Sequence, residues 1–316
     1  MKINLSSAAL LFPGQGSQTV GMGKDLAAQY PIAKQTFDEA DVILALPFSN
    51  LMFNGPVEEL NDTLNTQPAL FIHSLAAYRV FSNLHLQSKP AALASLAGHS
   101  LGEISALAAA GALSFEDGLR LVRVRAELMK RAGELAPGGM AAILGLDIPT
   151  LEKVCAEASL PAERVQVAND NCPGQVVISG AKPAVERAML GAKSAGAKRA
   201  LPLAVSIAAH SSLMDSIQAE WNQAVDAAAF HPLQIPVIGN VRAAALTSSD
   251  EARADLKAQM QSRVRWTDSV RTLSGMGINT FIECGTGSVL SGLVKRIAEG
   301  VTTYPLGNPQ DFAALE

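Results

Sequence analysis

The chain has 316 residues, of which 48% are hydrophobic and 17% charged, and its formal net charge is −4. This length suits one large domain, or a large and a small one, and the composition excludes intrinsic disorder, which needs few apolar and many charged residues. No basic stripe runs along the chain, so no nucleic-acid partner is expected.

The cysteines and apolar runs bear on the cellular compartment. Cys155, Cys172 and Cys284 are widely spaced and odd in number, which predicts reduced thiols in a cytoplasmic protein and neither a disulfide framework nor a metal site. The apolar run Ala8–Phe12 is too short for a signal peptide, and Ile104–Phe115 is too short to cross a bilayer. We therefore expect a cytoplasmic protein without a membrane partner.

Short apolar runs alternate with helical patterns along most of the chain. This alternation is typical of an α/β fold with a mostly parallel sheet. In chain order, the patterns predict a strand at Ala8–Phe12, a helix at Pro68–Leu84, a strand at Leu93–Ala97, a helix at Leu101–Ala112 and a strand at Phe281–Glu283.

One segment follows a different order of elements. It has a strand, a helix, two strands, a helix and a strand: Met140–Leu146, Ile148–Ala158, Val165–Ala168, Gln175–Ser179, Lys182–Ala195 and Ala200–Val205. The order βαββαβ is that of a ferredoxin-like unit. We therefore expect a large domain formed by residues 1–137 and 207–316, with a small domain of residues 138–206 inserted into it.

The best candidate for a nucleophile is Ser100. Gly98-His99-Ser100-Leu101-Gly102 matches G-x-S-x-G between a predicted strand and a predicted helix, which is the context that this motif requires. Ser100 should lie on a strained turn, with glycines that let neighbouring backbone pass closely. Its hydroxyl would then lie at a helix N-terminus, where N–H groups and the helix dipole stabilise an oxyanion. The alternative is a chance match in a chain rich in Gly and Ala, and the strand–turn–helix context argues against it.

A serine nucleophile needs a base, which is usually a histidine. We expect His99 to point away from its neighbour Ser100, and His73, His85 and His231 to have structural or surface roles. The remaining histidine, His210, lies where the chain returns from the small domain to the large one, and clefts between domains often hold sites. His210 is therefore the candidate base, with a structural role as the open alternative.

Two glycine-rich loops follow strands and resemble nucleotide-binding motifs. In Gly14-Gln15-Gly16 and Gly285-Thr286-Gly287, the next glycine of a dinucleotide fingerprint is missing, since Thr19 and Leu290 occupy its positions. No Gly-Lys-Ser/Thr sequence is present either, which excludes a P-loop. We expect these loops to bring backbone close to the Ser100 turn.

Arg125 lies on the apolar face of a predicted helix. Its neighbours at i±3 and i±4 are Leu121, Val122, Leu128 and Met129, so the pattern buries a permanent cation. A buried charge is costly unless it is paired. The partner is either a structural carboxylate or an anionic substrate, and the planar guanidinium binds carboxylates through two parallel hydrogen bonds.

Several motifs together resemble malonyl-CoA:acyl carrier protein transacylases, from about Leu11 to Arg296. They occur in that family's order: Phe12-Pro13-Gly14-Gln15-Gly16-Ser17-Gln18, Thr66-Gln67-Pro68-Ala69-Leu70, Gly98-His99-Ser100-Leu101-Gly102-Glu103, Arg125, Pro173-Gly174-Gln175-Val176-Val177-Ile178-Ser179-Gly180 and His210. The resemblance implies an α/β-hydrolase-like large domain with an inserted ferredoxin-like small domain.

The resemblance also implies a role for each site residue. Ser100 would be the nucleophile and His210 its base, oriented by the main-chain carbonyl of Gln259 instead of an aspartate. Arg125 would bind the malonyl carboxylate. The remaining matches are Gln15 and the N–H of Leu101 as the oxyanion hole, and Gln67, Asn169 and Asn171 as polar residues of the cleft.

The implied activity is transfer of a malonyl group from malonyl-CoA to the phosphopantetheine thiol of an acyl carrier protein, through a malonyl-serine, for fatty acid synthesis. No cofactor or metal is expected. The alternatives are a malonyl transferase that serves a malonate decarboxylase or a polyketide carrier, and, from another class, a thioesterase or hydrolase. Ala209 stands where relatives often have Ser or Phe, which leaves acyl selectivity open. Arg263-Val264-Arg265-Trp266 and Gly285-Thr286-Gly287 depart from the family without touching the implied chemistry.

Overall fold

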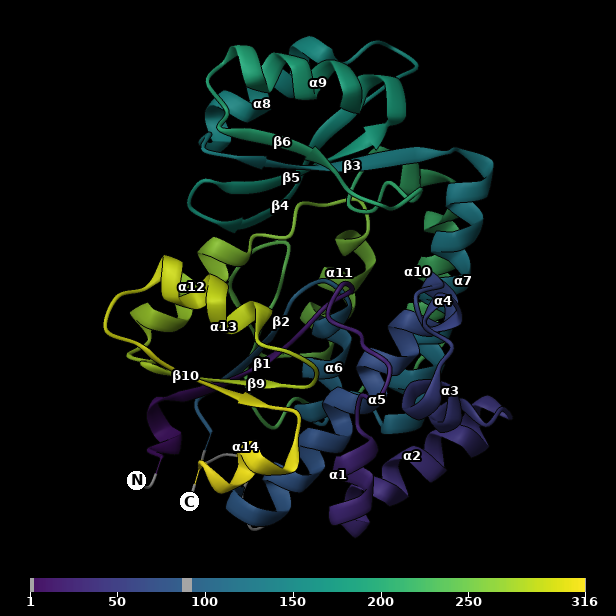
Figure 1. Cartoon of the computed structure of the whole chain (residues 1–316), viewed down its shortest axis with the longest axis vertical. Coiled ribbons are helices and arrows are strands. Elements are labelled where there is room, and N and C mark those ends of the chain that lie inside the picture. The colour runs from purple at the N-terminus through teal and green to yellow at the C-terminus, as the bar shows by residue number, and fades with distance from the viewer. Residues whose placement is uncertain (1–2, 87–92, 316) are drawn as a thin grey trace.

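The computed structural model describes residues 3–86 and 93–315, which form two separate β-sheets (Figure 1). The six-stranded sheet has the order β10-β9-β1-β2-β7-β8, and it is parallel except for the β7–β8 pair. Its strands are β1 (Ala8–Phe12), β2 (Ser95–Gly98), β7 (Val237–Ile238), β8 (Ala245–Leu246), β9 (Thr280–Cys284) and β10 (Thr302–Leu306).

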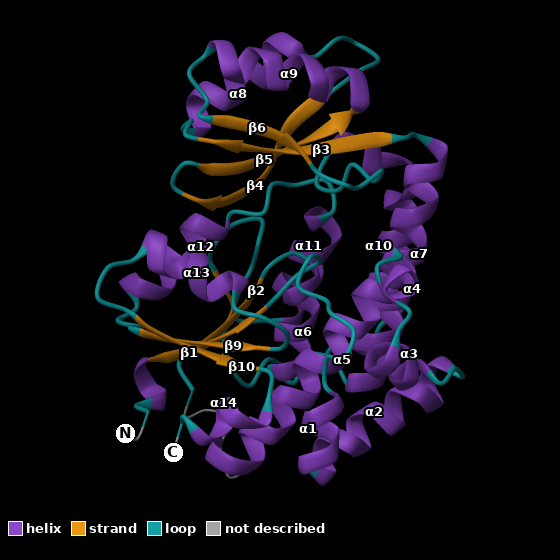
Figure 2. Cartoon of the chain, in the orientation of Figure 1, coloured by secondary structure: helices purple, strands orange, loops and turns teal. Residues whose placement is uncertain are grey.

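Helices cover both faces of this sheet (Figure 2). Alternate residues of β1 pack to opposite sides: Leu10 lies in a core with α5, α6 and α7, and Leu11 in a core with α12 and α13. A strand buried on both faces needs an unbroken apolar run, as Ala8–Phe12 provides. The helices around this sheet are α1 (Lys24–Gln29), α2 (Pro31–Leu44), α3 (Phe48–Asn54), α4 (Val57–Leu60), α5 (Thr63–Phe81), α6 (Leu101–Ala109), α7 (Phe115–Leu135), α10 (Gln218–Ala227), α11 (Ser249–Gln259), α12 (Trp266–Gly275), α13 (Val289–Ile297) and α14 (Pro309–Ala313).

The four-stranded sheet is antiparallel and has the order β4-β5-β3-β6. Two helices cover its face away from the larger sheet (Figure 1), and the elements are β3 (Gly138–Leu144), α8 (Ile148–Ala158), β4 (Val165–Cys172), β5 (Gln175–Ala181), α9 (Lys182–Ser194) and β6 (Arg199–Pro202). This confirms the predicted α/β fold with a ferredoxin-like second domain. We propose residues 138–206 as the limits of that domain, because its own core residues lie between Ala141 and Ala200.

The predicted helix at Pro68–Leu84 begins earlier than the sequence suggested. It is α5, which starts at Thr63 because the Asp62 side chain accepts a hydrogen bond from the Leu64 N–H. Pro68 therefore lies inside the helix, where it cannot donate to the Leu64 carbonyl; Arg123 Nη1 donates to that oxygen instead (2.9 Å).

Two differences in strand length shape the site. β4 continues beyond the predicted Ala168 to Cys172, so Asn169 and Asn171 are strand residues. β6 ends at Pro202, before the predicted Val205, and the segment Leu203–Ser206 lines the active-site cavity instead. Among the described helices, none combines the length and apolar character needed to cross a bilayer.

Candidate active site

Ser100 lies on a strained turn between β2 and α6, as the motif predicts. Its backbone has φ 53° and ψ −108°, a region that residues with a side chain rarely adopt. A Cβ on Gly98 would lie 1.9 Å from the carbonyl carbon of Gly102, and one on Gly102 would lie 2.0 Å from the Phe12 oxygen. The two glycines of the motif are therefore required by close backbone contacts.

His210 contacts the Ser100 hydroxyl directly, with 2.8 Å between Nε2 and Oγ. On its other side, Nδ1 is 2.9 Å from the main-chain oxygen of Gln259 and 3.1 Å from that of Ser262. Carbonyl oxygens only accept, so Nδ1 carries the proton and Nε2 presents its lone pair to Ser100. The carbonyl of Gln259 thus occupies the place that an aspartate has in a Ser-His-Asp triad.

The His210 imidazole is neutral at ordinary pH. Burial, followed by the positive charge of Arg125, lowers the pKa of His210 from 6.5 to about 3. A neutral imidazole can accept the Ser100 proton without first losing one of its own.

This lowered pKa predicts a flat pH profile. We expect kcat/KM for malonyl-CoA to stay constant from about pH 5 to pH 8, because this parameter reports the ionisation of the free enzyme. A base with the ordinary pKa of 6.5 would lose roughly 30-fold over the same interval as it became protonated. Such a loss in initial-rate measurements would contradict a neutral buried base.

Arg125 projects from α7 beside Ser100 and is 2% exposed. Nη1 donates to Gln67 Oε1 (2.8 Å), and Nη2 donates to Ser100 Oγ (3.1 Å) and to Gln259 Oε1 (3.1 Å). Burial lowers the pKa of Arg125 to about 10, so the guanidinium stays charged at neutral pH.

All these partners of Arg125 are neutral. Among the described residues, no carboxylate forms a salt bridge with Arg125, and its buried Nε has no hydrogen-bond partner. Glu103 is the described carboxylate whose charge acts on Arg125, but it forms no salt bridge with the guanidinium, so the structural carboxylate that the sequence left open is not a direct contact. Arg125 lines the cavity in front of Ser100, so an anion entering that cavity can reach it.

The cavity has a volume of about 850 Å³ and lies between the two domains. The large domain contributes Gln15 and Leu101 to it, and β4 contributes Asn169 and Asn171. Gln67 does not line it; this residue is fully buried and accepts a hydrogen bond from Arg125 instead.

Gln15 and Leu101, the residues expected to form the oxyanion hole, both line the cavity together with Ser100. Leu101 is the first residue of α6, so its N–H has no carbonyl acceptor within the helix. Gln15 follows β1 in the first glycine-rich loop, where a Cβ on Gly14 would lie 2.5 Å from the His99 oxygen. That loop therefore approaches the Ser100 turn, as predicted.

The neighbouring histidines are held by other groups. His99 Nε2 lies 2.8 Å from Asn171 Oδ1, which links the Ser100 turn to β4. His73 Nδ1 and Nε2 bond Thr286 Oγ1 (2.6 Å) and the Gly307 oxygen (2.9 Å). Within the described residues, no three His, Cys, Asp or Glu side chains form a cluster that could hold a metal ion.

Asn240, a residue that the sequence analysis did not predict for the site, holds the Ser100 turn through two hydrogen bonds. Its Oδ1 accepts from the Ser100 N–H (2.7 Å), and its Nδ2 donates to the Gly98 oxygen (2.7 Å). An asparagine after the two-residue strand β7 has no local pattern that marks it. Asn240 reaches the turn because β7 pairs with β2, the strand that ends just before Ser100.

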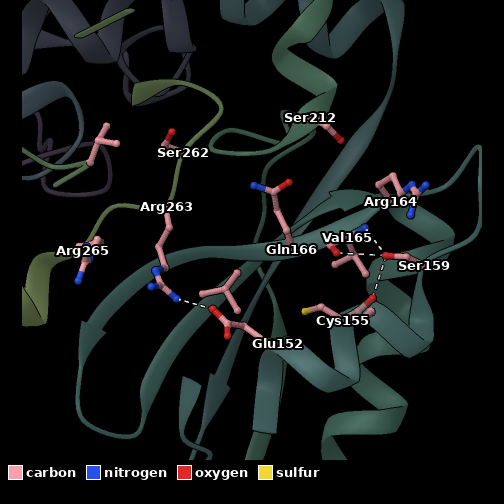
Figure 3. A pocket seen from close by; sticks show the side chains of 13 residues that line it. Glu152, Cys155, Ser159, Arg164, Val165, Gln166, Ser212, Ser262, Arg263 and Arg265 are labelled. Carbon is pink, nitrogen blue, oxygen red and sulfur yellow. Dashed lines mark hydrogen bonds and ion pairs between the residues drawn. The ribbon is translucent and has the colours of Figure 1, made fainter. Parts of the chain in front are cut away.

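A second cavity, of about 730 Å³, is lined by residues that include Gln166, Ser262 and Arg263 (Figure 3). Gln166 Nε2 lines it and donates to the His210 main-chain oxygen (3.1 Å), while Arg263 pairs with Glu152 across it (2.8 Å). Ser100 does not line this cavity, so it is distinct from the candidate active site.

Comparisons with known proteins agree with this geometry. Residues 9–304 match the acyl transferase domain family. The malonyl CoA-acyl carrier protein transacylase of Bacillus subtilis is 45% identical over 306 residues, which cover 97% of this chain and 95% of the relative. The chain belongs to the malonyl CoA-acyl carrier protein transacylase family.

Solved structures of this family have the same fold. An acyl carrier protein S-malonyltransferase from Vibrio cholerae has a TM-score of 0.94 at 44% identity, over 98% of this chain and 100% of the other. A malonyl-transacylase solved in complex with a type II PKS acyl-carrier protein has a TM-score of 0.92 at 40% identity, over 98% and 99% of the two chains.

Proposed function

We propose that this protein transfers a malonyl group from malonyl-CoA to the phosphopantetheine thiol of an acyl carrier protein, for fatty acid synthesis. The observation that carries this proposal is Arg125, a buried cation with neutral partners 3.1 Å from the nucleophile of a serine–histidine pair. An acyl group with its own carboxylate satisfies this cation, whereas an uncharged acyl group does not.

In the first half-reaction, Ser100 Oγ attacks the thioester carbonyl while His210 Nε2 takes its proton. The Leu101 N–H and Gln15 stabilise the oxyanion. The bond from carbon to the CoA sulfur then breaks, and His210 returns the proton to that sulfur. The malonyl carboxylate on Arg125 neutralises the charge that contributes to the low pKa of His210, so substrate binding makes the base stronger.

The second half-reaction reverses these steps with the carrier's thiol as the attacking group. His210 takes the thiol proton, the new thioester forms, and Ser100 regains its hydrogen. The Gln259 carbonyl keeps the imidazole in the tautomer that both halves need. Asn169 and Asn171 supply polar contacts on the wall of the cavity that β4 forms. No metal or cofactor takes part in these steps, and we place the reaction in the cytoplasm, without a membrane or nucleic-acid partner.

A carrier protein is favoured over water as the second acceptor. A relative of this chain was solved with an acyl-carrier protein bound, and the cavity opens between the two domains. A malonate decarboxylase or polyketide carrier would use the same residues, so the carrier is decided by assay. A hydrolase for general esters would have no use for Arg125.

Transfer of labelled malonyl-CoA tests the proposal. We expect label on a fatty acid carrier that holds phosphopantetheine and none on the same carrier without it, because the thiol is the acceptor. Polyketide and malonate decarboxylase carriers, assayed in parallel, should show lower kcat/KM. Release of the label as free malonate, at a rate that carriers do not change, would identify a hydrolase and contradict the proposal.

A further inference from the structure

Glu103 is a carboxyl group buried directly behind the nucleophile. It lies in the first turn of α6 and is fully buried. Its Oε2 accepts from Gln259 Nε2 (2.8 Å) and from the Asn240 main-chain N–H (3.1 Å). One oxygen atom therefore holds two residues that contact the Ser100 turn.

Those two residues hold the backbone on both sides of Ser100. Gln259 Nε2 donates to the Ser100 oxygen (3.0 Å), and the Asn240 side chain bonds the Ser100 N–H and the Gly98 oxygen. Gln259 also orients His210 through its main-chain oxygen. The strained turn and the base are thus fixed by the same small group of buried amides.

The orientation of the Gln259 amide depends on Glu103. Its oxygen faces the Arg125 guanidinium, and its NH2 group faces two acceptors, the Ser100 oxygen and Glu103 Oε2. If this amide were flipped, its NH2 group would face the N–H donors of Arg125, and its oxygen would face the Ser100 oxygen and Glu103 Oε2. Glu103 Oε2 must therefore accept, and any proton on this carboxyl must be on Oε1.

Asp255 provides the acceptor for such a proton. It is 4% exposed, its Oδ2 accepts from the Val241 N–H (3.2 Å), and its carboxyl is hydrogen-bonded to that of Glu103. Burial, followed by Asp255, raises the pKa of Glu103 well above its ordinary range. Glu103 Oε1 and Asp255 Oδ1 are both buried, and no N–H or O–H group of the described residues donates to either of them. Two carboxyls that interact in a buried site cannot both be ionised.

We propose that Glu103 and Asp255 share one proton, and that this carboxyl pair positions the nucleophile, the base and the carboxylate-binding arginine through Gln259 and Asn240. Neither carboxyl touches the reacting atoms, so both are positioning residues. The pair retains one negative charge, which lies near the buried cation of Arg125. The inference rests on the proposed function, because it concerns the rate at which Ser100 is malonylated.

Amide substitutions test the shared proton. In Glu103→Gln, the new amide donates to Asp255 and its oxygen accepts from Gln259 and Asn240. In Asp255→Asn, the new amide donates to an ionised Glu103 while its oxygen accepts from Val241. Each single variant keeps every donor opposite an acceptor, so the rate constant of malonyl-enzyme formation should stay close to that of the unchanged protein.

In the double variant, the oxygen of the amide at position 255 must accept from Val241, and the oxygen at position 103 must accept from Gln259 and Asn240. Both NH2 groups then face each other, so two donors meet. We expect the double variant to form the malonyl-enzyme at least about tenfold more slowly than the product of the two single-variant rate effects predicts. Quenched-flow experiments read by intact-protein mass spectrometry measure all four rate constants. A double-variant rate equal to that product would overturn the shared proton.

Glu103→Leu tests the positioning role, since it keeps a similar volume and removes the acceptor. In the fraction of Glu103→Leu molecules that becomes malonylated, the acylation rate constant should be about 10²-fold lower than in the unchanged protein. This is the scale expected for a small misplacement of reacting groups. Glu283→Leu is the matched control: Glu283 is fully buried, and its carboxyl accepts from the N–H groups of Leu290 and Ser291, away from Ser100. This control should lower the melting temperature and leave the acylation rate unchanged.

Two outcomes would overturn the inference in different ways. If Glu103→Leu only lowers the melting temperature, as the control does, the carboxyl pair is structural and the proposed function stands. If the unchanged protein forms no malonyl adduct at all, the proposed function fails and this inference with it. For a positioning residue, we expect Glu103→Gln to keep the acylation rate that Glu103→Leu loses.

Discussion

Ser100→Ala is expected to abolish the malonyl adduct that the unchanged protein forms with malonyl-CoA. The hydroxyl is 2.8 Å from His210 Nε2, and alanine has no oxygen that could form the ester. Transfer to the carrier should fall on the order of 10⁴-fold or more, since a nucleophile, its base and its orienting group act as a unit. Intact-protein mass spectrometry measures the adduct, and the carrier assay measures the rate.

Ser105→Ala provides the control for this loss. Ser105 is a buried serine of α6, the helix that follows Ser100, and its hydroxyl has no hydrogen-bond partner among the described residues. It should keep both the adduct and the rate. A malonyl group that persists in Ser100→Ala, located on another side chain by peptide mapping, would show that the nucleophile was misassigned.

Arg125→Ala is expected to reverse much of the preference for malonyl-CoA over acetyl-CoA. Arg125 is buried among neutral partners, and losing one member of a buried ion pair costs about 3–5 kcal/mol. This corresponds to roughly two to four powers of ten in kcat/KM for malonyl-CoA. Activity with acetyl-CoA should fall much less, because acetyl has no carboxylate. Arg125→Lys should recover little, because lysine lacks the planar fork.

The controls for Arg125→Ala separate selectivity from folding. The control is Arg120→Ala, which changes a residue of the same helix and removes an exposed ion pair with Glu116. It should leave the ratio of malonyl to acetyl activity unchanged. Circular dichroism reports whether each variant folds. If folded Arg125→Ala keeps the ratio of malonyl to acetyl activity of the unchanged protein, Arg125 does not bind the carboxylate and its role is structural.

Local patterns in the sequence determined much of this protein. Each β1 residue is apolar because the strand is buried on both faces, and that composition is readable without the fold. The G-x-S-x-G pattern predicted the turn at Ser100 partly because Gly98 is required by a contact with Gly102, only four residues further on. Gly102 is instead required by the main chain of Phe12, which the fold brings to the turn from β1. Helical spacing alone placed Arg125 on the buried face, since that placement depends only on its neighbours at i±3 and i±4.

The partners of these residues were decided by the tertiary structure. His210 is 110 positions from Ser100, and the carbonyl that orients it belongs to the main chain, which leaves no mark in the residue type. That Arg125 faces neutral groups and a cavity could not follow from its helical phase, which specifies burial and not what lies opposite. Glu103 and Asp255 come from separate helices, α6 and α11, and their carboxyls interact only in the folded chain. Local periodicity determines which face of an element is buried, whereas contacts between distant elements determine which atoms meet there.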